Sequence, residues 1–323
     1  MMFQALALGL WAVAGAVVAL PGGPPVGMDY LAYDAATGRI WVPAGNTGNV
    51  DVLDVATGKV TALGGFATAP SPRPGRPNAG PSSVTVGDGV VWVGNRADNR
   101  LCAIDARKVR KGACVQLDSM PDGVAWVSAT RELWVTTPRD HSLTIVAVGS
   151  GKPGPATTIK LDGAPEGYAV DSARGIFYTN LEDKDRTLAF DVKTRKVIAT
   201  FSPGCGEEGP RGLAIDPVRR LLFVACTNGA MTLDLAHGGG VVGRLRTGVG
   251  VDNIDYHAAK QLLYIAAAGA ATLTIARVTD AGALAAVTSV ATAKGARNAV
   301  VDGRGTAYVA DSPGGHLIVV GAP

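Results

Sequence analysis

This chain of 323 residues contains a repeated segment. One position of that segment carries the residues whose types are best suited to chemistry. Each follows a Pro or an equivalent residue just before a short apolar run, as in PEGYAVD at 165–171 and PRGLAID at 210–216. Six of these seven positions are charged, four acids and two arginines, in a chain of which 18% is charged. In chain order they are Asp29, Ser82, Asp122, Glu166, Arg211, Asp252 and Arg297.

These residue types support three kinds of chemistry. Carboxylates that meet at one place could hold Ca²⁺ or another divalent cation, because hard cations prefer oxygen ligands. Asp122, Glu166 and Asp252 are the acids predicted to bind such a metal. Arg211 and Arg297 could instead hold a carboxylate or a phosphate of a ligand. The third interpretation is an Arg–carboxylate network that ties the fold together, since unpaired charges crowded together are costly.

A repeat that runs along the whole chain supplies the elements that would bring these positions together. A short apolar run with one aromatic residue returns seven times, at spacings of 41 to 51 residues. Three further short runs accompany each one, joined by polar turns and without a helical period. Units of about 40–45 residues with four strands predict an all-β, seven-bladed β-propeller with four-stranded antiparallel blades. The aromatic positions, which we expect to pack between blades, are Trp41, Trp92, Trp134, Phe177, Phe223, Tyr264 and Tyr308.

In a propeller the innermost strand of each blade lines the axis. The seven chemical positions are therefore predicted to form a funnel ring at one mouth of the axis. Asn180, Glu207 and Glu208 lie in loops that share this face and are candidate additions to the site. The Pro-rich segment 66–81 is predicted to overhang the same face, as a lid, a partner contact or a tolerated insertion.

The seventh unit ends at Val320 after three strands, which would leave two strand edges unpaired. Residues 17–20 read VVAL and run into Pro-Gly-Gly, much as VTAL at 60–63 in the first unit runs into Gly-Gly. We therefore predict that Val17–Leu20 is the fourth strand of the last blade and closes the ring.

The N-terminal segment has features of a secretory signal peptide. Residues 3–20 carry no charge, and Ala14-Gly15-Ala16 fits a small-residue cleavage site, although no Lys or Arg precedes the apolar run. Residues 1–16 are predicted to be removed, which leaves residues 17–323 as a single propeller domain without a stable membrane span. The expected location is the periplasm or the outside of the cell.

The four cysteines are an even number and fit an oxidising compartment. Four cysteines allow three connectivities. The local one pairs Cys102 with Cys114 across a hairpin turn, and Cys205 with Cys226 across a loop and a strand pair. A zinc site is the weaker alternative, because the chain has neither a C-x-x-C motif nor a nearby His pair.

Three repeated segments resemble the motif of the YVTN-type seven-bladed β-propellers of bacteria: YTN at 178–180, WVGN at 92–95 and YVAD at 308–311. The resemblance covers about residues 26–320. It implies an exported, soluble and mostly monomeric propeller, and a disulfide between Cys205 and Cys226. Longer stretches that resemble a secreted branch of this family lie at 165–197, 204–229 and 249–275.

Two functions from different classes follow from these features. The first is an exported binding or scaffold protein that holds a small molecule or a protein at its funnel face. The alternative is a divalent-metal-dependent hydrolase or lactonase, by analogy with gluconolactonase-type propellers, whose metal would polarise a carbonyl and activate water. Whether the protein is an enzyme stays open, but the chain has no G-x-S-x-G, P-loop or H-E-x-x-H motif, which favours binding. A net charge of +3 and basic turns without interleaved aromatics argue against a nucleic-acid partner.

Overall fold

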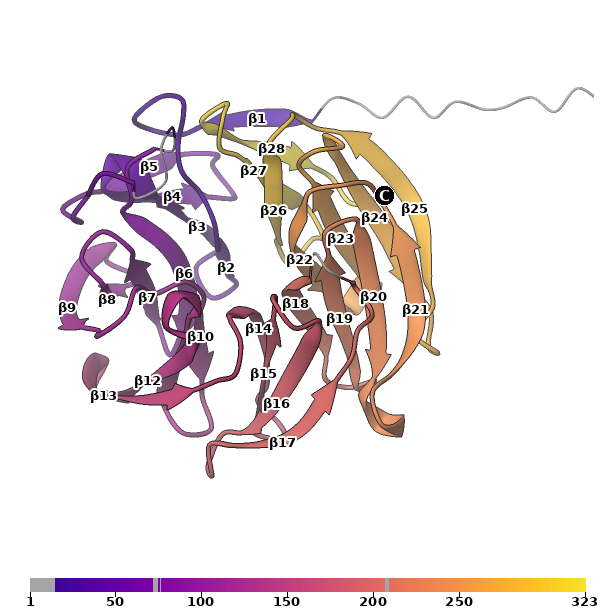
Figure 1. Ribbon diagram of the computed structural model, residues 1–323. Helices are drawn as coiled ribbons and strands as arrows, with labels where there is room; N and C mark the ends of the chain where they lie inside the picture. Colours follow the sequence, from indigo (N-terminus) through magenta and orange to yellow (C-terminus); the bar gives the residue numbers. More distant parts are fainter. Residues whose placement is uncertain (1–14, 72–74, 76, 207–208) are drawn as a thin grey trace, which may run out of the picture.

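Seven antiparallel sheets of four strands each are arranged around a common axis (Figure 1). This computed structural model describes residues 15–71, 75, 77–206 and 209–323. Each sheet is one blade. Within a blade the strands follow one another outward from the axis in chain order, except that the N-terminal strand is the outermost strand of the last blade. The prediction of a seven-bladed propeller with four-stranded antiparallel blades is confirmed.

The strands of blades 1 to 4, from the axis outward, are as follows. Blade 1 contains β2 (Ala32–Asp34), β3 (Arg39–Ala44), β4 (Asn49–Asp54) and β5 (Val60–Leu63). Blade 2 contains β6 (Pro81–Gly87), β7 (Val90–Asn95), β8 (Arg100–Asp105) and β9 (Arg110–Gln116). Blade 3 contains β10 (Val124–Val127), β11 (Glu132–Thr137), β12 (Ser142–Gly149) and β13 (Lys152–Lys160). Blade 4 contains β14 (Pro165–Asp171), β15 (Ile176–Leu181), β16 (Arg186–Asp191) and β17 (Lys196–Phe201).

The remaining three blades complete the ring. Blade 5 contains β18 (Pro210–Asp216), β19 (Leu221–Cys226), β20 (Gly229–Asp234) and β21 (Gly240–Arg246). Blade 6 contains β22 (Val251–His257), β23 (Leu262–Ala267), β24 (Thr272–Val278) and β25 (Leu284–Ala291). Blade 7 contains β26 (Ala296–Val301), β27 (Ala307–Asp311), β28 (His316–Val320) and β1 (Ala16–Ala19). Short 3₁₀ helices occupy Gly45–Thr47, Pro138–Asp140, Leu235–His237 and Ala258–Lys260.

The core lies between neighbouring blades and is organised around the repeated aromatic position. All seven of these side chains lie on the second strand of a blade and are at most 5% exposed. Trp134, for example, packs against Phe177 of the next blade with ring centroids 4.8 Å apart. Full burial of an aromatic side chain contributes about 2–3 kcal/mol. The repeated aromatic residue therefore holds adjacent blades together, as its spacing predicts.

The N-terminal strand closes the ring. β1 pairs antiparallel with β28, from Ala16 opposite Val319 to Ala19 opposite His316 (Figure 1). The strand begins and ends one residue earlier than predicted, because Leu20 leaves the ladder, bonds through its N–H to the carbonyl of Gly315 at 3.1 Å and is buried. The predicted closure is confirmed. The proposed signal segment lies mostly outside the described residues, and its cleavage stays a prediction.

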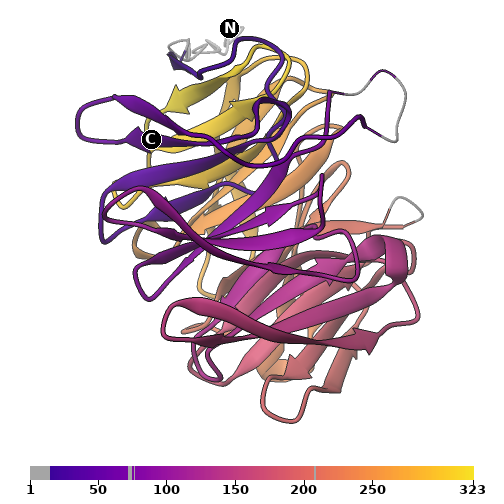
Figure 2. The same cartoon turned by 90° about the vertical axis from the view of Figure 1, so that its left-hand side faces the viewer.

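Both predicted disulfides are present. Cys102 and Cys114 face each other in the β8–β9 pair, and Cys205 in the loop after β17 is bonded to Cys226 at the end of β19. That loop and the described part of segment 66–81 project from the same side of the propeller (Figure 2). The funnel face therefore carries both of these loops, as expected from the order of the strands.

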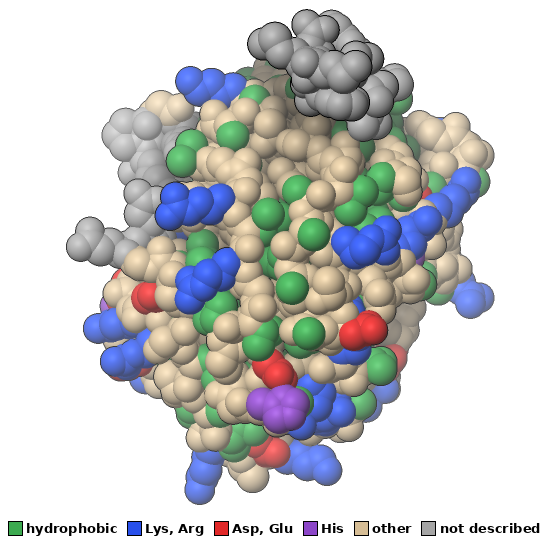
Figure 3. All heavy atoms as spheres, turned by 90° about the vertical axis from the view of Figure 1, so that its right-hand side faces the viewer, with side chains coloured by type: hydrophobic (Ala, Val, Ile, Leu, Met, Phe, Trp, Pro, Cys, Tyr) green, Lys and Arg blue, Asp and Glu red, His purple; other side chains and the backbone are tan. Residues whose placement is uncertain are grey.

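The outer wall formed around β21 and β25 carries Lys and Arg side chains that are spread among neutral and apolar ones (Figure 3). No basic face of the kind that binds nucleic acid gathers on this side. Across the part of the chain that the structure describes, no helix combines the length and the hydropathy needed to cross a membrane.

Candidate functional site at the funnel mouth

In five blades the pairing between the inner strand and its neighbour is irregular near the start of the inner strand. The register shifts between Glu166 and Tyr168 in blade 4 and between Arg297 and Ala299 in blade 7, and similar shifts open β6, β18 and β22. A bulge re-aims the side chains beside it. In blade 4 the extra residue is Gly167, at φ 65°, a left-handed conformation that glycine adopts without steric cost. In these five blades the shift lies beside the polar ring residue, whereas Asp29 and Asp122 precede the inner strands β2 and β10.

Arg96 connects three blades at this mouth, and it was not among the predicted site residues. It follows β7 of blade 2, and its Nη2 donates to Asp29 Oδ2 at 2.8 Å and to Asp122 Oδ1. Burial alone would lower the pKa of Arg96, but the charges of Asp29 and Glu166 raise it above its ordinary value. Arg96 therefore neutralises acids from blades 1 and 3 at the same time.

Arg297 and Arg211 make two further links between blades. Arg297 of blade 7 contacts Asp252 of blade 6, with Nη1 and Oδ2 2.9 Å apart, and lies 3.9 Å from an oxygen of Asp29. Arg211 of blade 5 donates to Glu182 of blade 4. The Arg–carboxylate network expected as one interpretation of the ring is thus present.

Tyr30 is the second residue that the sequence analysis missed. Its hydroxyl donates to Glu166 Oε1 at 3.0 Å, accepts from the N–H of Gly167 at 3.2 Å and lies 3.4 Å from Asp122 Oδ2. Its ring stacks on that of Tyr168, with centroids 5.9 Å apart. Burial, followed by the charge of Glu166, raises the pKa of Tyr30 well above its ordinary value, so the hydroxyl stays a donor at neutral pH. Tyr30 therefore joins blade 1 to blades 3 and 4 across the axis.

The charges at the mouth do not balance. Among the residues of the mouth that the structure describes, three guanidinium groups, on Arg96, Arg211 and Arg297, face five carboxylates. Each carboxylate except that of Glu166 has an ion pair with one of these arginines. The carboxylates are Asp29, Asp122, Glu166, Glu182 and Asp252.

Glu166 shows the effect of this imbalance. Burial first, and then the charges of Asp252 and Asp29, raise the pKa of Glu166 to about 8. Burial likewise raises the pKa of Asp252, against the opposing charge of Arg297. A carboxylate held at such a pKa takes up a proton near neutral pH in the absence of another cation. One additional positive group beside Glu166 would therefore neutralise the charge of this carboxylate.

A cavity of about 360 Å³ adjoins this network along the axis. Asp29 and Tyr30 belong to both, since they line the cavity and also contact the charged groups at the mouth. The Nδ2 of Asn253, which lies on the lining, is buried and has no hydrogen-bond partner among the described residues. Polar lining residues include Asp29, Tyr30, Tyr168, Asn253, Asp255 and Asn298.

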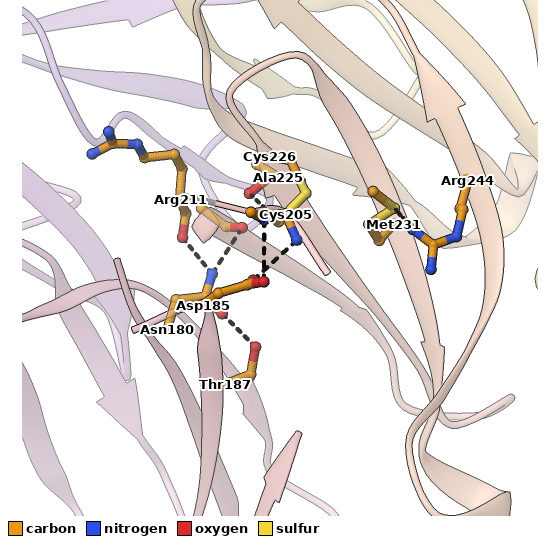
Figure 4. Close-up of a disulfide and its surroundings, with 11 residues drawn as sticks. Asn180, Asp185, Thr187, Cys205, Arg211, Ala225, Cys226, Met231 and Arg244 are labelled. Atoms are coloured by element: carbon orange, nitrogen blue, oxygen red, sulfur yellow. Dashed lines mark hydrogen bonds between the residues drawn. A yellow bond between two sulfur atoms is a disulfide. The ribbon is translucent and has the colours of Figure 1, made fainter. Parts of the chain in front are cut away.

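The other predicted site residues have structural contacts. Asn180 is fully buried, donates from Nδ2 to the carbonyl of Arg211 in the next blade at 2.5 Å and accepts from Thr187 at 2.6 Å (Figure 4). Ser82 lies 3.4 Å from the carbonyl of Gly94 within its own blade. Asp185 accepts from the N–H of Cys205 at 3.0 Å and so fixes the disulfide loop (Figure 4). Glu207 and Glu208 of that loop lie outside the described residues.

The three acids predicted to bind a metal reach the same mouth but have other partners. Asp122 contacts Arg96, Glu166 accepts from Tyr30, and Asp252 contacts Arg297. In the described part of the chain, no group of three or more His, Cys, Asp or Glu side chains is arranged to hold a metal ion. The hydrolase alternative thus stays a prediction from the sequence.

Two signals in the sequence could have pointed to the missed residues. Arg96 directly follows the strand VVWVGN, in the loop between second and third strands that shares the funnel face. Tyr30 directly follows the ring position Asp29. Neither signal reveals that the side chains reach other blades, because that depends on the distance between blades across the centre of the propeller.

Comparison with known proteins supports the fold alone. No family model matches the chain, and no curated protein matches it. A chain from the Mitotic Checkpoint Complex superposes with a TM-score of 0.79 at 13% identity, covering 100% of this chain and 95% of that one. Hydrazine synthase from Kuenenia stuttgartiensis has a TM-score of 0.75 at 14% identity, covering 93% and 96%. Virginiamycin B lyase from Staphylococcus aureus has a TM-score of 0.73 at 14% identity, covering 94% and 98%.

These neighbours include an enzyme and a chain of a multiprotein complex. At such identities they define the class of the chain, a seven-bladed β-propeller, and propellers host many unrelated functions. The resemblance to YVTN-type propellers therefore stays a prediction.

Proposed function

We propose that this protein is an exported binding propeller of the YVTN type whose funnel mouth holds a small molecule with a cationic group. The observation that carries the proposal is Glu166, the one carboxylate of the described network that has no arginine partner. Without a ligand, a proton neutralises the carboxylate of Glu166 near neutral pH. A ligand ammonium group beside Glu166 would take the place of that proton.

The surrounding contacts favour binding over catalysis. Arg96 and Tyr30 hold the acids of blades 1, 3 and 4 in fixed positions, so the site is formed before a ligand arrives. The stacked rings of Tyr30 and Tyr168 offer an aromatic surface close to Glu166, which suits an organic cation.

Export is part of the proposal because of the cysteines. Both pairs form disulfides, and such bonds persist in oxidising compartments. The apolar segment 3–20 and its small-residue cleavage motif support the same location. We propose a monomer in the periplasm or outside the cell, with a small molecule as its partner.

A thermal-shift screen tests this function. At pH 8.5, where Glu166 is largely ionised, we expect choline or spermidine to raise the melting temperature by a few degrees, as a ligand at 100 times its Kd stabilises by about 2.7 kcal/mol. Glycerol, glucose and glutarate serve as neutral and anionic probes and should have no effect. E166Q should remove the shift because it removes the charge.

The matched control is D162N, which removes the same charge from the loop that leads into blade 4, at a side chain that is 65% exposed. This variant should keep the shift of the wild type. Equal stabilisation of E166Q and the wild type, or stabilisation by glutarate instead, would refute a cationic ligand at Glu166.

A further inference from the structure

A second hollow lies on the outer part of the propeller, between blades 2 and 3, with a volume of about 650 Å³. Its walls come from β9 of blade 2 and from the turn between β12 and β13 of blade 3. Small residues form much of its lining, among them Gly89, Ala103, Gly112, Ala113 and Gly151. We name this hollow the interblade groove.

Four cations line the interblade groove, and none has an ion-pair partner among the described residues: Arg107, Arg110, Lys111 and Lys152. The Nζ of Lys111 donates to the carbonyl of Gly65 and lies over the ring of Phe66, which leaves the other three to face the groove. All three are exposed. Arg107 lies in the turn between β8 and β9, Arg110 is the first residue of β9, and Lys152 reaches the groove from the neighbouring blade. Free positive charge therefore comes from both blades.

The acids near the groove offset only part of this charge, since Asp105 lies opposite Arg110 in the β8–β9 pair and Asp88 has another partner. The Oδ1 of Asp105 accepts from the N–H groups of Arg107 and Lys108 at 3.1 and 2.9 Å, which fixes the turn. The backbone bonds from Lys108 and Arg107, and then the charges of Lys108 and Arg110, lower the pKa of Asp105, so this carboxylate caps the turn and opposes part of the charge of Arg110. Asp88, beside the groove, is paired with Arg131 at 2.6 Å. The groove thus keeps an excess of positive charge.

We propose that the interblade groove binds an acidic glycan chain, carrying sulfate or uronic-acid groups. Three cations spread over two blades match a linear polyanion better than a single small anion. The small side chains leave the floor open to sugar rings. No aromatic residue lines the groove, so it offers no surface on which nucleobases could stack. This inference is independent of the funnel mouth, which lies at the axis.

Binding of a fluorescent heparin hexasaccharide tests the proposal. The groove variant R107S/R110S/K152S should bind at least tenfold more weakly than the wild type. The control variant K59S/K193S/K196S removes the same charge from exposed lysines on the corresponding turns of blades 1 and 4, and should change affinity less than threefold. Both variants alter exposed side chains, so their melting temperatures should match that of the wild type.

Further probes decide between a glycan and unspecific attraction. Hyaluronan fragments should compete with heparin, whereas neutral dextran should not. Three results would overturn the proposal: no heparin binding by the wild type, equal loss in the groove and control variants, or duplex DNA of the same charge binding as tightly as heparin.

Discussion

We expect a chain that starts at Pro21 to melt about 5–10 °C below one that starts at Gly15, given a loss of about 3–5 kcal/mol. The six residues between these starts include all of β1, which makes the outer ladder of blade 7. They also include Leu20, which is 5% exposed and packs in the core between blades 7 and 1. Removal costs the ladder bonds and the apolar burial, and it leaves β28 as an unpaired edge.

Both chains lack the segment before Gly15, so the comparison isolates β1 and Leu20. Thermal unfolding followed by circular dichroism measures the difference. A synthetic peptide of residues 15–23 added to the shorter chain should restore most of the melting temperature, because it can pair with β28 as the covalent strand does. V17S serves as a control at a side chain that is 57% exposed and should leave the melting temperature nearly unchanged. Identical melting of the two chains would contradict closure by β1.

The second large effect is expected at Arg96. R96M should lower the free energy of unfolding by about 2–4 kcal/mol, because it leaves Asp29 and Asp122 without their shared cation. These carboxylates are only 9% and 5% exposed, so water compensates little for the loss. Denaturant unfolding at pH 7.5 measures the change. Adding D122N to R96M should recover part of the stability, since one of the stranded charges is then removed.

Arg100 provides the matched control for Arg96. It lies in the same blade, and its side chain is 53% exposed and 3.8 Å from Asp98. R100M should cost no more than about 0.5 kcal/mol, as exposed ion pairs contribute little. If R96M and R100M destabilise the protein equally, Arg96 does not hold the blades together at the axis.

The fold was predictable because its signal is repeated. Trp41, Trp134 and Phe223 are examples of a position that is repeated in every blade. Because this position is buried between two sheets, it requires an aromatic or similarly large side chain each time. Closure by the N-terminal strand was predictable for a similar reason, since the seventh unit lacks a fourth strand. The exact end of the strand was not, because Leu20 turns into the core instead of extending the ladder.

The candidate site was only partly predictable. The ring positions follow from the repeat. Ion pairs and the bonds of Tyr30 connect Asp29, Asp122, Glu166, Asp252 and Arg297, whereas Arg211 pairs with Glu182. The residues that organise the network break the repeat: Arg96 extends from a loop of blade 2, and Tyr30 crosses the axis to blade 4. Such contacts depend on distances between blades that no local pattern encodes. Asn180 is a contrasting example. It belongs to the repeated motif, at YTN 178–180, and it donates from blade 4 to the carbonyl of Arg211 in blade 5.

The structural network and the ligand site are compatible, because the arginines that form the ion pairs are not the group that would meet the ligand. Arg96, Arg211 and Arg297 hold four of the five carboxylates, while Glu166 remains available beside Tyr30. Stability thus depends on the arginines, whereas binding is expected to depend on Glu166. Variants at Arg96 and Glu166 should accordingly separate the two properties.

The central claim, that Glu166 exchanges a proton for a cationic ligand, is tested most directly by calorimetric titration with choline, whose charge does not change with pH. Because the pKa of Glu166 is about 8, the group is mostly protonated at pH 6.5 and ionised at pH 9.5. Titrations in two buffers of different ionisation enthalpy count the protons released. We predict close to one proton released at pH 6.5 and none at pH 9.5, with affinity rising as pH increases toward 8. Choline binding without proton release and with the same affinity at both pH values, or no choline binding at all, would contradict the account.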